Sequence, residues 1–147
     1  MLKGIPSILN PDLLKIMMEM GHGDTLVIGD GNFPAAACAK RLVRCDGHGA
    51  AELLDAIMTF FPLDTYVEKP VAVMATADGE DAPIWKEYQQ IIAKREGEAA
   101  FEQVERFDFY ARAREAYAVI STGGGGPVCQ YYPDKGRRHR INRRYIP

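Results

Sequence analysis

Short runs of consecutive apolar residues alternate along this chain with longer segments in which apolar residues recur every three or four positions. The short runs are typical of strands buried on both faces, and the longer segments are typical of helices that pack one face on a core. Strands that alternate with helices predict an α/β fold with a mainly parallel sheet. We therefore expect strands at residues 25–29, from 42 onward, 71–75, 104–107 and 116–121, and helices at residues 11–20, 50–61, 83–95 and 109–115.

Three consecutive residues mark the start of the first expected helix. Asn10 is a good N-cap, Pro11 suits the first helical position, and Asp12 is favourable in the first turn. Gly21 ends the segment. Between these signals the apolar side chains recur at helical spacing, which predicts that the helix packs on the core through Leu13, Leu14, Met17 and Met18.

Length and composition narrow the class of protein. The chain has 147 residues, of which 47% are apolar and 26% charged, and this predicts a single domain over residues 1–147. No apolar run approaches the ~18 residues of a membrane span, and the N-terminal residues lack the apolar core of a signal peptide. Three cysteines without CxxC spacing predict free thiols, so we expect a cytoplasmic protein; they are Cys38, Cys45 and Cys129.

The charge is distributed unevenly along the chain. The total is −2, yet residues 137–147 contain five arginines and no acid, which leaves −7 on the remainder. A basic tail could bind nucleic acid, or it could dock on an acidic surface or stay solvated. No aromatic stacking residues of a known binding motif accompany the arginines, so we expect no nucleic-acid partner.

Two turns contain a histidine between two glycines. His22 stands in Gly-His-Gly-Asp with Asp24, just before an expected strand, and Asp30 follows that strand. Histidine exchanges protons near neutral pH, and a neighbouring carboxylate can orient its ring, so His22 and Asp24 are candidates for acid–base chemistry. The alternative is a surface turn in which Asp24 bonds its own backbone. His48 has the same surroundings, and composition alone does not choose between the two histidines.

A set of motifs resembles one known family. The chain contains Gly-His-Gly-Asp at 21–24, then Asp30, then Phe33-Pro34, and later Arg-Phe-Asp-Phe-Tyr at 106–110. Together these elements resemble the RbsD/FucU family of sugar mutarotases, and the fucose branch in particular. The similarity extends in order over residues 1 to about 123.

The resemblance implies a fold, an assembly and a set of site residues. Family members form a three-layer α/β/α sandwich and assemble into pentameric rings or decamers with sites near subunit interfaces. The resemblance places the catalytic histidine at His22 and sugar-binding side chains at Asp30 and Arg106. It gives no role to His48, which becomes a turn residue.

The implied reaction interconverts the α and β anomers of L-fucose or a related aldose through the open-chain aldehyde. His22 would act as the acid and base, while Asp30 and Arg106 bind hydroxyl or ring oxygens. Such a reaction needs no metal or organic cofactor, and we expect none. Plainer alternatives are a strand-end cap for Asp30 and a surface ion pair with Glu105 for Arg106. The rings of Phe33 and Tyr110 could contact the sugar or belong to the core.

The C-terminal segment departs from the family. Members carry Tyr-Gly-Asn or Tyr-Ala-Asn after a Thr-Gly turn, whereas this chain has Val128-Cys-Gln130 at that place. We expect Val128 and Gln130 to line the altered pocket by position only. Codons for residues 127–135 can be chosen so that a frame one base away reads Pro-Tyr-Ala-Asn-Ile-Ile-Leu-Thr-Lys, so the segment could be a frameshift product.

The altered segment keeps a second function open. A protein that has lost efficient turnover could serve as a non-catalytic monosaccharide-binding accessory of sugar uptake or catabolism.

The glycine run at 123–126 could also cradle a phosphate, but it lacks the Lys and Ser/Thr of a P-loop, and a flexible turn is the simpler interpretation. We expect an isomerase without a membrane or nucleic-acid partner.

Overall fold

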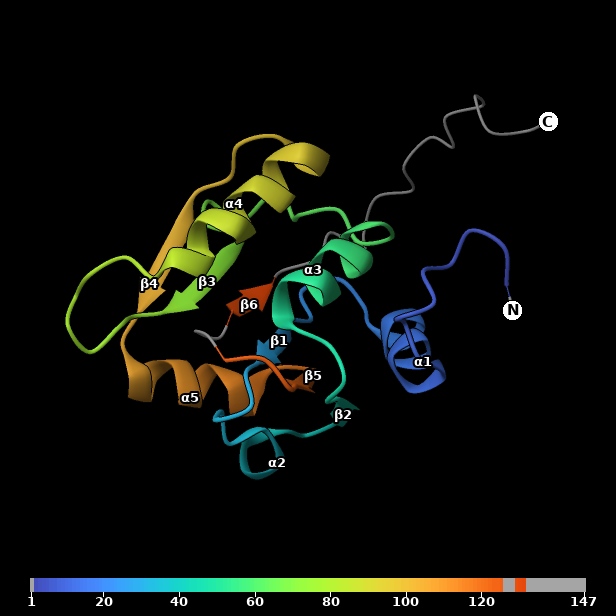
Figure 1. Ribbon diagram of the computed structural model, residues 1–147, viewed down its shortest axis with the longest axis horizontal. Coiled ribbons are helices and arrows are strands. Elements are labelled where there is room, and N and C mark those ends of the chain that lie inside the picture. Colours follow the sequence, from blue (N-terminus) through green and yellow to red (C-terminus); the bar gives the residue numbers. More distant parts are fainter. Residues whose placement is uncertain (1, 126–128, 132–147) are drawn as a thin grey trace.

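The computed structural model describes residues 2–125 and 129–131 of the chain, and its strands form one sheet (Figure 1). The order across this sheet is β2-β5-β1-β6-β3-β4. Only β6 among these strands runs antiparallel to its neighbours, β1 and β3, so the mainly parallel sheet is confirmed. The strands of the described part are β1 (Leu26–Gly29), β2 (Leu42–Cys45), β3 (Val71–Met74), β4 (Phe101–Val104), β5 (Ala118–Thr122) and β6 (Cys129–Tyr131).

Helices cover both faces of the sheet, which confirms the three-layer sandwich (Figure 1). On one face the side chains of Leu26, Ile28 and other strand residues pack with α1, α3 and α4. On the other face Val27 and Val119 pack with α2, α5 and the ring of Phe33. Successive side chains of a strand point into the two cores in turn, so both faces of the strand are buried. This explains why the strand sequences are continuous apolar runs. The helices are α1 (Pro11–Glu19), α2 (Ala35–Cys38), α3 (Ala50–Met58), α4 (Pro83–Glu96) and α5 (Arg106–Glu115).

The predicted start of the first helix is confirmed. The Asn10 side chain accepts a hydrogen bond from the backbone N–H of Leu13 at 2.8 Å, and Pro11 is the first residue of α1. One detail of its apolar face is wrong, because the Met18 side chain is 80% exposed and Ile16 is buried instead.

Three elements differ from the prediction. The strand expected at 104–107 lies at 101–104, because the Glu105 carboxylate accepts bonds from the N–H groups of Phe107 (2.8 Å) and Asp108 (3.2 Å) and so begins α5. The four-residue α2 is too short to give a periodic signal. Strand β6 was not predicted either, since it is defined by backbone pairing with two partners that are distant in sequence.

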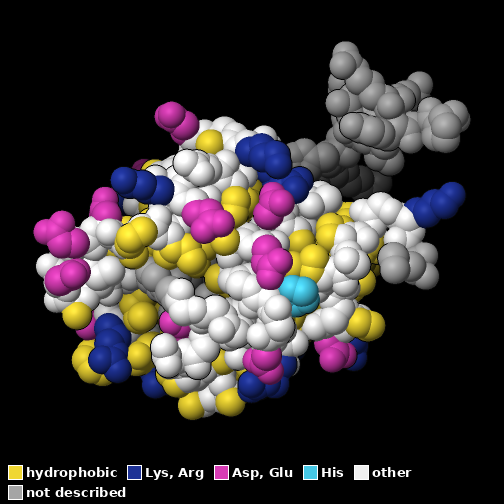
Figure 2. All heavy atoms as spheres, viewed as in Figure 1, with side chains coloured by type: hydrophobic (Ala, Val, Ile, Leu, Met, Phe, Trp, Pro, Cys, Tyr) yellow, Lys and Arg dark blue, Asp and Glu magenta, His cyan; other side chains and the backbone are white. Residues whose placement is uncertain are grey.

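Figure 2 shows acidic and basic side chains interspersed with apolar ones over the face that carries α3 and α4. Within the described ranges, the model has no helix with the length and hydropathy needed to cross a bilayer. Val128 and the basic segment 137–147 lie outside the described residues.

Candidate functional site

A cavity of about 420 Å³ opens where β1 and β3 end, beside the first turns of α5. Three of the residues expected to bind substrate, Asp30, Arg106 and Tyr110, line it together. The volume falls within the range of small-molecule sites, and the carboxyl ends of parallel strands are where such sites form. The structure therefore brings together in space residues that the sequence separates by up to 80 positions.

The end of β1 is shaped so that Asp30 and Phe33 both reach the cavity. The Asp30 carboxylate oxygen Oδ1 accepts a hydrogen bond from the N–H of Asn32 at 3.1 Å, which tightens the turn. A side chain at Gly29 would come within 2.7 Å of the Phe33 ring, so glycine at this strand end lets the ring fold back over the sheet. Phe33 is only 7% exposed and belongs to the core on that face.

Arg106 and Tyr110 lie one turn apart at the start of α5. The Arg106 Nε donates a hydrogen bond to the Tyr110 hydroxyl at 2.9 Å, and the guanidinium carbon lies 5.5 Å from the centre of the tyrosine ring. The Tyr110 ring in turn packs edge-on against Phe33, with centroids 5.6 Å apart. The Glu105 carboxylate, the partner in the alternative ion pair, caps α5 as described above. Arg106 is therefore held by an aromatic support that keeps its other nitrogens available to a ligand.

A salt bridge fixes α5 against the sheet. The two guanidinium nitrogens of Arg112 bond the two carboxylate oxygens of Glu102 at 2.7 and 2.8 Å. These hydrogen bonds lower the pKa of Glu102 below its usual value. Because Glu102 is in β4 and Arg112 in α5, the pair helps to place the start of the helix, and with it Arg106, over the cavity.

His22 and Asp24 lie at the opposite edge of the sheet. They precede β1, whereas Asp30 follows it, and an extended rise of ~3.3 Å per residue separates Thr25 from Asp30 by about 16 Å. The His22 side chain is exposed in its turn. The Asp24 carboxylate accepts a hydrogen bond from the Gly21 N–H at 2.7 Å, as the plainer interpretation of this turn predicts. Within one subunit the structure does not bring His22 and Asp24 to the cavity.

His48 has a structural contact. Its Nδ1 lies 3.2 Å from Oε1 of Glu52, and the same oxygen accepts a bond from the Gly49 N–H at 2.9 Å. Glu52 thus caps the start of α3. These contacts agree with the role of His48 as a turn residue.

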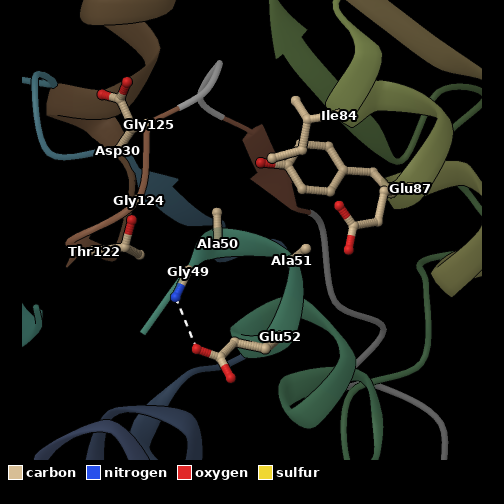
Figure 3. Close-up of a pocket in the computed structure, with 11 residues that line it drawn as sticks. Asp30, Gly49, Ala50, Ala51, Glu52, Ile84, Glu87, Thr122, Gly124 and Gly125 are labelled. Atoms are coloured by element: carbon tan, nitrogen blue, oxygen red, sulfur yellow. Dashed lines mark hydrogen bonds between the residues drawn. The ribbon is translucent and has the colours of Figure 1, made fainter. Parts of the chain in front are cut away.

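A second cavity of about 280 Å³ lies between the start of α3 and α4 (Figure 3). Figure 3 shows Asp30, Thr122 and two glycines on one side of it and Ile84 and Glu87 on the other. Asp30 lines both cavities.

The glycine run beside this second cavity is anchored in the part that the structure describes. The N–H of Gly123 donates to the carbonyl of His48 at 3.1 Å, and the carbonyl of Gly124 accepts from Gly31 at 2.8 Å. A side chain at Gly123 would overlap the carbonyl oxygen of Asp46. The start of the run is therefore closely packed rather than a free turn.

The structure does not show Val128 or Gln130 at the cavity, and it adds one residue that was not predicted. Val128 lies outside the described residues, and Gln130 is placed only as a member of β6, paired with Val27 and Ala72. Met74, the last residue of β3, lines the larger cavity and was not predicted. The rule that sites gather at strand carboxyl ends could have indicated it, because residue 74 lies within the strand expected at 71–75.

Comparison with known proteins assigns the family. The model of the RbsD / FucU transport protein family matches residues 3–128. This chain belongs to the RbsD/FucU family. The fucose mutarotase of Homo sapiens is 44% identical over 130 residues, covering 83% of this chain and 84% of that protein. The L-fucose mutarotase of Glaesserella parasuis serovar 5 (strain SH0165) is 48% identical over 126 residues, covering 84% and 86%.

A solved structure agrees with both fold and family. The fucose mutarotase of Streptococcus pneumoniae, solved in complex with L-fucose, superposes with a TM-score of 0.83 at 42% sequence identity. The match covers 89% of this chain and 97% of that chain. The resemblance noted from the sequence motifs is therefore confirmed.

Proposed function

We propose that this protein is an isomerase, a mutarotase that interconverts the α and β anomers of L-fucose. The observation that carries the proposal is the cavity in which Asp30, Arg106 and Tyr110 converge, in a chain 44–48% identical to proteins named fucose mutarotases. A carboxylate, a guanidinium and a phenol together accept and donate hydrogen bonds to several hydroxyls of one pyranose. The non-catalytic accessory role rests only on the departure at residues 128–130, and the named relatives are mutarotases.

The reaction needs one proton given and one taken. Opening the ring requires a proton at the ring oxygen and loss of the proton from the anomeric hydroxyl, and closure on the other carbonyl face reverses both transfers. In this proposal His22, oriented by Asp24, exchanges the proton directly or through water. Asp30 and Arg106 hold the sugar so that the anomeric centre faces the histidine.

The position of His22 requires a second copy of the chain. Since His22 and Asp30 lie at opposite edges of the sheet, we infer that each cavity is completed by His22 from a neighbouring subunit. Exposed apolar side chains flank both halves: Met18 is 80% exposed near His22, and Phe107 is 68% exposed beside Arg106. These exposed side chains are candidate contacts of a homo-oligomer, which the family resemblance predicts to be a pentamer or decamer.

We place the protein in the cytoplasm. Cys38 and Cys45 are buried free thiols, as is usual in a reducing compartment.

Saturation-difference proton NMR tests the activity. The purified protein is incubated with L-fucose, D-ribose, D-galactose or L-rhamnose, and one anomeric signal is saturated. The proposal predicts saturation transfer to the other anomer of L-fucose, and loss of that transfer in His22→Ala. Binding of L-fucose without any transfer would contradict it and would favour the accessory role.

A further inference from the structure

The cavity of about 420 Å³ at the ends of β1 and β3 has two chemically different sides. Its charged and phenolic groups come from the β1–α2 connection and from α5. The end of β3 and the connection to α4 contribute carbon surface instead, and the ring of Phe33 extends that surface. We call these side chains the apolar wall: Phe33, Met74, Ala75, Ala77 and Ala82.

Two residues of the connection that forms the apolar wall use polar groups within the protein. The N–H of Ala75 donates to the carbonyl of Val104 at 2.8 Å. Thr76, which also lines the cavity, donates its hydroxyl hydrogen to the carbonyl of Glu80 at 2.6 Å, and its own carbonyl accepts from Gly79 at 3.3 Å. A ligand group placed against this wall therefore meets mainly carbon.

Met74 is the largest aliphatic member of the wall and is held in place. It ends β3, and it is half-buried against the core that includes Phe33 and Phe109. Ala72, two residues earlier on the same strand face, is fully buried in that core. The methionine side chain thus projects from the rigid sheet at the cavity rather than from a loop.

We propose that the apolar wall is the subsite for the C6 methyl group of a 6-deoxyhexose, with Met74 as a specificity-determining residue. L-fucose and L-galactose share every stereocentre and differ only in a hydroxyl on C6. Against the wall the methyl group is buried favourably, whereas the hydroxyl of L-galactose loses water without gaining a partner. This inference rests on the proposed function, because it assumes that the sugar occupies the cavity of Asp30 and Arg106.

The test compares kcat/KM for anomer exchange of L-fucose and L-galactose. Discrimination against one added hydroxyl by an apolar pocket is about 10- to 100-fold, and we expect the protein to prefer L-fucose by that factor. Met74→Gln brings an amide to the wall and lowers the preference about tenfold. Met74→Leu retains the preference. Leu2→Gln, a comparable change at an exposed aliphatic residue outside the cavity, leaves it unaltered.

The outcomes separate this inference from the proposed function. Equal rates with both sugars, or an unchanged ratio in a folded Met74→Gln protein, would overturn the methyl subsite while leaving the mutarotase intact. If Met74→Gln fails to fold by circular dichroism, Ala75→Ser supplies the polar atom in its place. If neither sugar is exchanged, the proposed function fails, and the ratio of the two dissociation constants by calorimetry still decides whether the wall selects the methyl group.

Discussion

The two ends of β1 present contrasting structures. At the carboxyl end, Asp30, Phe33, Tyr110 and Arg106 are linked by a turn hydrogen bond, ring packing and a guanidinium–phenol bond around a cavity. At the amino end, His22 projects from an exposed turn that is closed by the Asp24 carboxylate. Under the proposed function, the carboxyl end supplies the binding half of the site and the amino end supplies the proton-exchanging group. The contrast predicts that binding and chemistry can be lost separately in this chain.

Replacing His22 should impair anomer exchange, whereas replacing Arg106 should impair sugar binding. These are the largest effects that we expect. His22→Ala should reduce anomer exchange by 10²- to 10⁴-fold and change the affinity for L-fucose little, because it removes general acid–base catalysis alone. Arg106→Ala should weaken L-fucose binding by about tenfold or more through loss of charge-assisted hydrogen bonds. Calorimetry and NMR exchange measure the two quantities, and His48→Ala serves as the matched histidine control. Similar losses of affinity in both variants would contradict the separation.

The C-terminal segment offers a way to strengthen the binding half. Changing residues 128–130 to the Tyr-Ala-Asn found in the family adds a phenol and an amide that can hydrogen-bond the sugar. We expect about a tenfold gain in kcat/KM, the value of one net hydrogen bond. NMR exchange on the substituted chain measures it, and Val128→Phe/Cys129→Ala/Gln130→Leu is the control without the polar atoms. An equal gain in both chains would show that the polar groups are not responsible.

The frameshift hypothesis concerns the same residues, and the coding DNA tests it. The coding DNA either permits Pro-Tyr-Ala-Asn-Ile-Ile-Leu-Thr-Lys in the neighbouring frame or does not. Codons that yield another peptide there would end that hypothesis without affecting the rest of the account.

Gly123 of the anchored glycine run should be sensitive to substitution, whereas Gly47, which lies in a different turn, should tolerate it. Gly123→Ala forces a methyl group against the carbonyl of Asp46 and should lower the free energy of unfolding by about 1–3 kcal/mol. Gly47→Ala, where a side chain meets open space, is the control and should change it by less than about 0.5 kcal/mol. Urea denaturation compares the two. A Gly123→Ala protein as stable as the control would mean that the loop is free to move.

The smallest expected effect concerns pH. The pKa of Glu102 is lowered in the folded protein by its bonds to Arg112, so the pair contributes stability above the unfolded pKa of the carboxyl and loses it as pH falls through the folded value. The pair is about one-third exposed, and solvent screening limits its contribution to about 1 kcal/mol or less. Glu102→Gln should lower the melting temperature at pH 7 and narrow its difference from the parent protein below pH 4. A difference that does not depend on pH would contradict this assignment.

The sequence predicted the parts of the fold that rest on local patterns. The Asn10 cap and the buried strands at β1, β3 and β5 follow from side-chain chemistry within a few residues. Strand β6 could not be predicted, because its three residues form a strand only through backbone pairing with β1 and β3, which are distant in sequence. Met74 lies within the strand expected at 71–75, so the strand-end rule could have indicated it, whereas the residues that face it across the cavity follow only from the packing of α5.

The candidate site divides in the same way. The motif resemblance indicated Asp30 and Arg106, Tyr110 was a candidate left open between sugar contact and core, and the fold brings the three residues together. The expected strand at 25–29 already separated His22 from Asp30, and β1 confirms that the two residues lie at opposite ends of it. The sequence did not predict that the cavity forms at the Asp30 end alone of these two, because that depends on the packing of β3 and α5 beside β1.

Subunit complementation tests the central claim most directly, namely that each site takes its histidine from a second copy. His22→Ala and Arg106→Ala chains are produced separately and then co-assembled in equal amounts, with hybrids verified by native mass spectrometry. If the two residues act across an interface, random assembly restores about a quarter of the sites and of the anomer exchange on L-fucose. If verified hybrids are as inactive as the two parents, both residues belong to one subunit, and the account of a site shared between subunits is wrong.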